Sequence, residues 1–162
     1  FEVEESPRQD VDDVGVSSTK IRKALENGDI ETANLYLGRH YTLTSVVVEG
    51  DKIGRTIGYP TANLAMPEPH KLIPFNGVYA VYASVEGKRY PAMMNIGLRP
   101  TVSGKNLNLE VHLLDFNQDI YGKSITIEFV EHLRNEKMFS GLDELKDQLA
   151  RDESAAKRVL HA

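Results

Sequence analysis

From residue 41 onward the chain is a succession of short runs rich in β-branched and aromatic residues, with no helical pattern between them. The clearest runs cover residues 41–49, 77–85, 88–96, 107–116 and 124–133. A shorter extended stretch at residues 61–64 interrupts the series early. Because no crossover helices connect these strands, the pattern predicts an antiparallel barrel or sandwich.

The first forty residues have a different pattern, which predicts two short helices. Ser17 or Ser18 can cap the first helix, and Gly28 ends it. Asp29 can cap the second helix, and Gly38 ends it. Two helices of this size bury too little surface to fold alone, so we interpret them as an attachment or as the remnant of a neighbouring domain.

The residues that follow position 139 predict one longer helix at the end of the chain. Ser140 can cap this helix, and Leu142, Leu145 and Leu149 share one of its faces. An apolar stripe of this kind is typical of a helix that packs against a globular core.

Composition excludes several classes of protein. The 162 residues suit one ordinary domain with a short appendage. None of them is cysteine, which excludes disulfides and thiolate metal sites and fits a reducing compartment, so we expect a cytoplasmic protein. A net charge of −5 argues against a broad nucleic-acid surface, and no apolar run approaches the roughly 20 residues that span a bilayer. We therefore expect neither nucleic acid nor a membrane as a partner.

The stretch DKIGRTIGYPTANLAMP, at residues 51–67, predicts a constrained loop with one basic side chain. Gly54 and Gly58 allow the backbone to turn with exposed amides, which suits phosphate oxygens. Arg55 adds a cationic fork to the same loop. The loop is a candidate cover for a bound phosphate group, and a plain glycine-rich connection is the alternative.

Thr61 and Asn63 follow directly in this loop and are separated by one small residue. In extended chain their side chains point to the same side, because the direction repeats every two residues. A hydroxyl and an amide carbonyl are hard oxygen ligands of the kind that magnesium accepts beside substrate phosphates. The alternative is that both side chains satisfy local backbone groups in a turn.

Glu110 is the candidate catalytic carboxylate. In the run LNLEVHLLDF it shares a face with Asn108 and His112, opposite a face of apolar side chains. A strand fixes a carboxylate more firmly than a loop does, which suits a general base. The alternative is that Glu110 and His112 simply occupy a solvated face.

Other common catalytic patterns are absent or broken in this sequence. The segment NQDIYGKS ends like a phosphate-binding loop, but it lacks the first glycine and precedes a strand pattern instead of a helix. The five histidines show no zinc-ligand spacing, and no GxSxG nucleophile motif occurs. We interpret NQDIYGKS as a turn between strands.

Four segments in order, GRTIGYPTANL, GVYAV, LEVHLLDFNQDIYGK and HLRNEKMFSGLDELKDQL, resemble the riboflavin kinase module of bacterial bifunctional riboflavin kinase/FAD synthetases. The resemblance covers about residues 41–160 and is specific, because four motifs agree in order and spacing. It implies a mainly β fold, a six-stranded antiparallel Greek-key barrel with a C-terminal helix and two short N-terminal helices. It also implies ATP- and magnesium-dependent phosphorylation of the riboflavin 5′-hydroxyl, which gives FMN and ADP.

The same resemblance implies roles for individual residues. Thr61 and Asn63 match the family's magnesium-binding pair. Glu110 matches its catalytic base. The residues that match the loop covering the phosphates are Gly54, Arg55 and Gly58. The residues that fall near the nucleotide are Gly77, Val78 and Tyr79, and those that fall in a second loop near the flavin are Arg134 and Phe139.

The segment VSSTKIRKALENGDIETANLYLGRHY resembles the end of the adenylyltransferase domain in the same bifunctional enzymes. It implies that residues 1–40 are the remnant of that domain and that residues 41–162 are the riboflavin kinase domain. No histidine lies in the HxGH-type motif of the adenylyltransferase, so we expect this chain not to make FAD, although a parent protein would. A flavin-binding barrel without kinase activity, serving redox chemistry or docking, is the alternative function.

Overall fold

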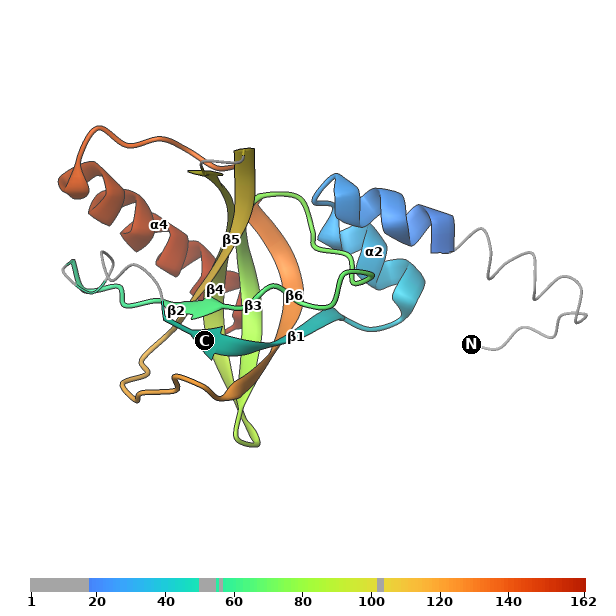
Figure 1. Ribbon diagram of the computed structural model, residues 1–162, viewed down its shortest axis with the longest axis horizontal. Helices are drawn as coiled ribbons and strands as arrows, with labels where there is room; N and C mark the ends of the chain where they lie inside the picture. The colour runs from blue at the N-terminus through green and yellow to red at the C-terminus, as the bar shows by residue number, and fades with distance from the viewer. Residues whose placement is uncertain (1–17, 50–54, 56, 102–103) are drawn as a thin grey trace, which may run out of the picture.

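The computed structural model describes residues 18–49, 55, 57–101 and 104–162. Its central feature is a closed antiparallel barrel with the strand order β1-β2-β5-β4-β3-β6 (Figure 1). The strands are β1 (Tyr41–Val48), β2 (Ala62–Leu64), β3 (Gly77–Val85), β4 (Lys88–Thr101), β5 (Gly104–Leu113) and β6 (Ser124–Arg134). The predicted six-stranded antiparallel barrel is confirmed, and the sandwich alternative is wrong.

Alternation along the strands gives the barrel an apolar interior and a partly apolar exterior. The buried interior cluster includes Tyr79, Met94 and Phe129, from three neighbouring strands. On the opposite face of β3 and β4, Ala80 and Met93 belong to a second buried cluster that also includes residues of the C-terminal helix. The sheet can therefore carry polar groups on its exterior while a helix still covers part of that face.

A helix at residues 18–26 and α2 (Ile30–Leu37) lie on the opposite side of the barrel from the C-terminal helix (Figure 1). Asp29 caps α2 as predicted, because its Oδ1 accepts a hydrogen bond from the Thr32 amide at 3.1 Å. Gly38 ends α2 in the left-handed conformation, which is also as predicted.

This helix pair packs directly against the barrel. Leu25 and Ala33 are fully buried members of the barrel's interior cluster. The Asn34 side chain donates a hydrogen bond to the Phe129 carbonyl and accepts one from the Tyr41 amide, each at 2.8 Å. The pair is therefore joined to β1 and β6 by apolar contact and by hydrogen bonds.

The C-terminal helix α4 (Leu142–Leu160) differs from the prediction at its start. Gly141 occupies the N-cap, and the Ser140 amide instead donates to Glu144 Oε1 at 2.8 Å. The Ser140 cap is therefore wrong: the Ser140 hydroxyl donates to the same Glu144 oxygen at 3.3 Å, and no side chain caps the helix. Leu142 is 51% exposed, so the predicted apolar stripe starts later than expected. None of the described helices is both long and apolar enough to cross a membrane.

Gly77→Ala should destabilise the protein strongly. Gly77 has φ +147°, and an added Cβ would lie 2.5 Å from His132 Nε2 and 2.7 Å from the Arg134 carbonyl oxygen. Backbone strain and overpacking together should lower the free energy of unfolding by about 2–5 kcal/mol. Urea denaturation of both variants, Gly77→Ala and wild type, measures this loss.

Gly122→Ala is the matched control for that prediction. Gly122 also has a positive φ, +82°, but an added Cβ would have no neighbour within 4 Å. It should therefore lose only the conformational strain, about 1–2 kcal/mol. Equal losses in the two variants would contradict the close packing of Gly77 against β6.

Candidate active site

Thr61, Asn63 and Glu110 are brought together by the pairing of β2 with β5. The register sets Asn63 directly opposite Glu110. Thr61 lies just before β2 and donates from Oγ1 to Glu110 Oε1 at 2.9 Å. The neighbours of Glu110 on β5, Leu109 and Val111, are buried in the interior cluster. Glu110 therefore faces the exterior of the barrel, as the strand pattern predicted.

Asn63 has an unusual environment for an amide. Its residue is only 7% exposed, and its Oδ1 is buried without a hydrogen-bond partner. A buried polar atom left in this state costs about 1–3 kcal/mol. Thr61 Oγ1 keeps two acceptor lone pairs when it donates its proton to Glu110. The site thus holds two neutral oxygens with free acceptor capacity beside one carboxylate.

Two asparagines that were not predicted as site residues also approach Glu110. Asn108 Nδ2 donates to Glu110 Oε2 at 2.5 Å, and Asn95 on β4 lies opposite Glu110 in the strand register. Each carboxylate oxygen therefore accepts one side-chain hydrogen bond, from Thr61 or from Asn108. Alternation along the strand had placed Asn108 on the same face as Glu110. Asn95 could not be predicted, because nothing in the sequence shows that β4 pairs with β5.

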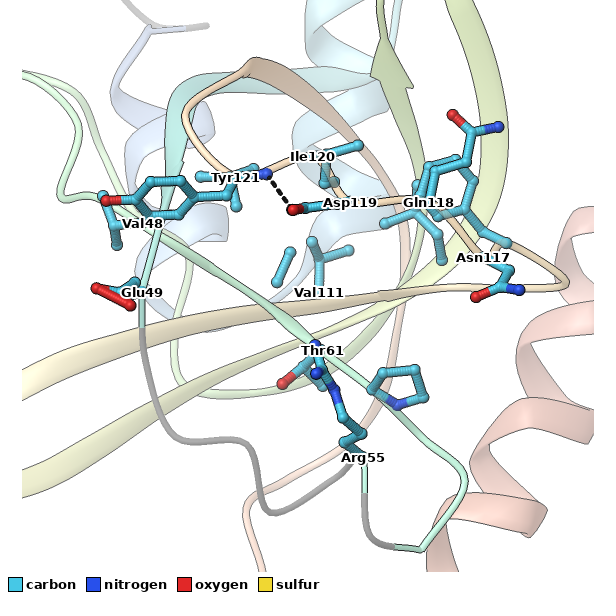
Figure 2. A pocket seen from close by; sticks show the side chains of 15 residues that line it. Val48, Glu49, Arg55, Thr61, Val111, Asn117, Gln118, Asp119, Ile120 and Tyr121 are labelled. Atoms are coloured by element: carbon cyan, nitrogen blue, oxygen red, sulfur yellow. Dashed lines mark hydrogen bonds between the residues drawn. The ribbon is translucent and has the colours of Figure 1, made fainter.

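A cavity of about 770 Å³ lies on one side of Thr61. We call it the turn cavity, because the turn at residues 117–121 lines one of its sides (Figure 2). Arg55 and Thr61 lie across the cavity from that turn, as Figure 2 shows. The Tyr121 amide donates to Asp119 Oδ1 at 3.0 Å, which helps to fix the turn. This turn was predicted between strands, but its place at the site was missed.

A second cavity, of about 320 Å³, lies between the barrel exterior and α4. We call it the helix cavity. Thr61 and Glu110 line it from the barrel, Arg134 and Phe139 from the segment at the end of β6, and Leu149 from α4. Thr61 lines both cavities, so the cavities adjoin at Thr61, whereas Glu110 lines only the helix cavity.

Tyr59 and His112 line the helix cavity next to this pair. Their rings meet edge to face with centroids 5.2 Å apart, and His112 Nδ1 lies 2.7 Å from the Pro60 carbonyl oxygen. The Tyr59 hydroxyl donates to Glu153 Oε1 on α4 at 2.9 Å. Burial, and then the hydrogen bond to Glu153, raises the pKa of Tyr59 above its usual value. Tyr59 therefore stays a neutral donor at physiological pH.

The remaining predicted site residues are distributed unevenly. Val78 lines the helix cavity, whereas Gly77 and Tyr79 are not among the residues lining either cavity. The Tyr79 side chain is fully buried inside the barrel, where its hydroxyl donates to the Phe75 carbonyl and burial raises its pKa. Gly58 adopts φ +88° in the loop before β2, and Gly54 lies outside the described residues.

His132, which is half-buried, and Asp152, which is buried, are further polar residues that were not predicted from the sequence. His132 Nε2 is buried without a hydrogen-bond partner. Burial lowers the pKa of His132, and a hydrogen bond with the Asn76 backbone acts in the opposite direction. Asp152 is 3% exposed and pairs with Arg134 Nη2 at 2.8 Å. The sequence did contain a sign that Asp152 is buried: it lies at helical spacing from Leu145 and Leu149, where an apolar residue would be expected.

A riboflavin kinase family model matches residues 37–160 of this chain. The bifunctional riboflavin kinase/FMN adenylyltransferase of Bacillus subtilis is 45% identical over 149 residues, which cover 90% of this chain and 47% of that protein. The chain thus spans about half the length of the curated relatives that it matches. The structure defines the class of this protein: it is a small antiparallel barrel that carries a polar site on the outer face of its sheet. Within it, the chain belongs to the riboflavin kinase family.

Two solved structures are similar to the chain. A Streptococcus pneumoniae structure described as a macrolide-efflux protein has a TM-score of 0.82 and 38% identity, over 86% of this chain and 46% of that one. Riboflavin kinase from Trypanosoma brucei has a TM-score of 0.50 and 24% identity, over 74% of this chain and 76% of that one. At that identity the second likeness shows the fold alone.

Asn63→Leu should leave stability unchanged or raise it by about 1 kcal/mol. The substitution removes a buried oxygen that has no partner and therefore contributes a desolvation cost of about 1–3 kcal/mol. The larger apolar side chain offsets part of that gain. The free energy of unfolding in urea is the quantity to measure.

Asn34→Leu is the matched control, because it changes the same residue type where the amide makes two hydrogen bonds of 2.8 Å. It should lose about 2–3 kcal/mol, since it also leaves two backbone groups unpaired. If Asn63→Leu lost as much as Asn34→Leu, the Asn63 oxygen would have to be satisfied in the folded protein.

Proposed function

We propose that this chain transfers the terminal phosphoryl group of ATP to the 5′-hydroxyl of riboflavin, giving FMN and ADP. The observation that carries the proposal is the position of Thr61, which lines both cavities and hydrogen-bonds Glu110. Two substrates in adjoining cavities would meet beside one carboxylate. Membership of the riboflavin kinase family supports this reaction over redox chemistry.

The two cavities differ in ways that suit the two substrates. The turn cavity is the larger, and Arg55 provides a cation for a polyanionic triphosphate. The helix cavity is lined by Phe139, Leu149 and other apolar side chains, which suit the flat ring system of a flavin. We therefore assign ATP to the turn cavity and riboflavin to the helix cavity.

Magnesium is the metal that the oxygens of this site fit. Thr61 Oγ1 and Asn63 Oδ1 would hold it, and the unpartnered state of the buried Asn63 oxygen supports that assignment. When bound, magnesium neutralises charge on the phosphate oxygens during transfer. Because both protein ligands are neutral, the other ligands would be water and phosphate oxygens.

Glu110 is the proposed general base. It takes the proton of the riboflavin 5′-hydroxyl as that oxygen forms its bond to the terminal phosphorus of ATP. The bond from that phosphorus to the bridging oxygen breaks, and ADP leaves with the electron pair. Thr61 and Asn108 each donate to one Glu110 oxygen, so they hold the carboxylate in one orientation. A carboxylate has acceptor positions left for the substrate hydroxyl.

We also propose that residues 1–40 are the end of an adenylyltransferase domain and residues 41–162 the kinase domain of a longer protein. The relatives named as bifunctional riboflavin kinase/FMN adenylyltransferase support this, since the chain spans about half of each. The whole protein would then convert FMN to FAD at a site outside this chain.

Chromatography of riboflavin incubated with the chain, ATP and magnesium tests the function directly. The proposal predicts FMN and ADP in equal amounts, and no FAD. Omitting magnesium should abolish the product, because the phosphates would then lack their counter-ion. A folded chain that binds riboflavin without phosphorylating it would instead support a flavin-holding barrel.

Glu110→Gln should lower kcat by about 10²–10⁴, the usual contribution of a general base. Glutamine keeps the shape and can still accept the Thr61 hydrogen bond, so affinity for ATP should change less than threefold. Glu131→Gln, at an exposed position on β6, is the matched control and should keep full activity. A Glu110→Gln enzyme with a near-normal rate would exclude Glu110 as the base.

A further inference from the structure

We propose that two adjacent carboxylates on α4, Asp152 and Glu153, are positioning residues that set the shape of the helix cavity. Each of them holds a wall residue from a different segment: Asp152 holds Arg134, at the end of β6, and Glu153 holds Tyr59, in the loop before β2. The inference rests on the proposed function, because it assigns the cavity they shape to riboflavin. It predicts that α4 determines the affinity for the flavin substrate and not the affinity for the nucleotide.

The contact between Asp152 and Arg134 is buried and doubly hydrogen-bonded. Arg134 Nε lies 2.9 Å from Asp152 Oδ1, and Arg134 Nη2 lies 2.8 Å from Asp152 Oδ2. The exposed fractions of the two side chains are 19% for Arg134 and 4% for Asp152. A forked pair of this kind fixes the plane of the guanidinium as well as its position.

Asp152 therefore holds Arg134 as a fixed wall of the helix cavity. Its third nitrogen, Nη1, donates to the Asn135 carbonyl at 3.1 Å, so all three nitrogens are engaged. The guanidinium carbon lies 5.8 Å from the centre of the Phe139 ring, within the range of a cation–π contact. Through Arg134, Asp152 thus orients the aromatic ring that lines the cavity.

Glu153 acts on the opposite loop. Its Oε1 accepts the Tyr59 hydroxyl at 2.9 Å, and its Oε2 lies 3.4 Å from Lys157 on the next turn of α4. Tyr59 belongs to the loop that leads into Thr61, two residues later. Holding the Tyr59 ring therefore also restrains the approach of that loop to the site.

A third connection links α4 to the segment after β6. Gln148 Nε2 donates to Asp152 Oδ1 at 2.9 Å, and Gln148 Oε1 lies 3.5 Å from Lys137 Nζ. Lys137 and Arg134 both line the helix cavity. Side chains of α4 thus contact wall residues on both sides of the cavity: Tyr59 in the loop before β2, and Arg134 and Lys137 at and after the end of β6.

Asp152→Asn tests the first contact, with Asp147→Asn as a control of equal charge change at an exposed position on α4. The proposal predicts that KM and Kd for riboflavin rise at least tenfold in Asp152→Asn. The KM for ATP should change less than twofold and kcat less than threefold. A purely structural role would lower the melting temperature without separating the two substrates. Asp147→Asn should match wild type in every measurement.

The Tyr59–Glu153 contact gives a second test that does not depend on a buried ion pair, in case Asp152→Asn fails to fold. Tyr59→Phe and Glu153→Met each remove the Tyr59–Glu153 hydrogen bond, and each should raise the riboflavin Kd about three- to tenfold. The double variant should bind riboflavin no more weakly than the single variant with the higher Kd. Lys157→Gln removes the other partner of Glu153 and should change this Kd less than twofold.

Riboflavin fluorescence on titration with protein measures every Kd in this series. Wild type that neither binds nor phosphorylates riboflavin would overturn the proposed function, and this inference with it. Wild type that makes FMN, with Asp152→Asn unchanged in riboflavin affinity, would overturn the inference alone. If Asp152→Asn does not fold, additive effects of Tyr59→Phe and Glu153→Met on the riboflavin Kd would likewise overturn it, and non-additive effects would support it.

Discussion

The pairing of β2 with β5 is the constraint on which the site depends. It is a short ladder, since β2 has only three residues, yet its register sets Asn63 opposite Glu110. A shift by one residue would turn one of these side chains into the barrel interior, because the direction alternates along a strand. The hydrogen bond from Thr61 to Glu110 lies at the end of the same ladder and marks the boundary between the two cavities.

The site is built at a cost to stability that the barrel and α4 offset. Asn63 buries an oxygen without a partner, and Asp152 buries a carboxylate that needs Arg134 beside it. Neither arrangement is what a core optimised for stability alone would contain. The apolar interior and the second cluster under α4 supply the burial that makes these groups tolerable. Polar residues in such positions are expected where function requires them.

Much of the architecture could be predicted from local patterns. The β-branched runs predicted the strands, and alternation predicted that Glu110 would face away from Leu109 and Val111. Alternation could also have shown that Tyr79 points into the barrel while Val78 points out. The structure places Val78 at the helix cavity and the Tyr79 side chain in the core. The expectation from family resemblance that both lie near the nucleotide stays a prediction.

The contacts that complete the site could not be predicted in this way, because they join distant segments. Asn95 approaches Glu110 only because β4 pairs with β5, and Tyr59 meets Glu153 across 94 residues of sequence. The cap of α4 was predicted at Ser140, but the N-cap is Gly141, and Ser140 donates to Glu144 instead of capping the helix. Sequence patterns predict which face of a strand or helix a side chain lies on. They do not predict which residue, distant in the sequence, it will contact on that face.

A crystal structure of the chain with Mn²⁺, ADP and riboflavin would test the central claim most directly. Anomalous scattering from manganese would locate the metal independently of any assumption about its ligands. The account predicts metal on the oxygens of Thr61 and Asn63, and the riboflavin 5′-hydroxyl within hydrogen-bond distance of Glu110. A metal bound elsewhere, or a flavin whose hydroxyl faces away from Glu110, would contradict it.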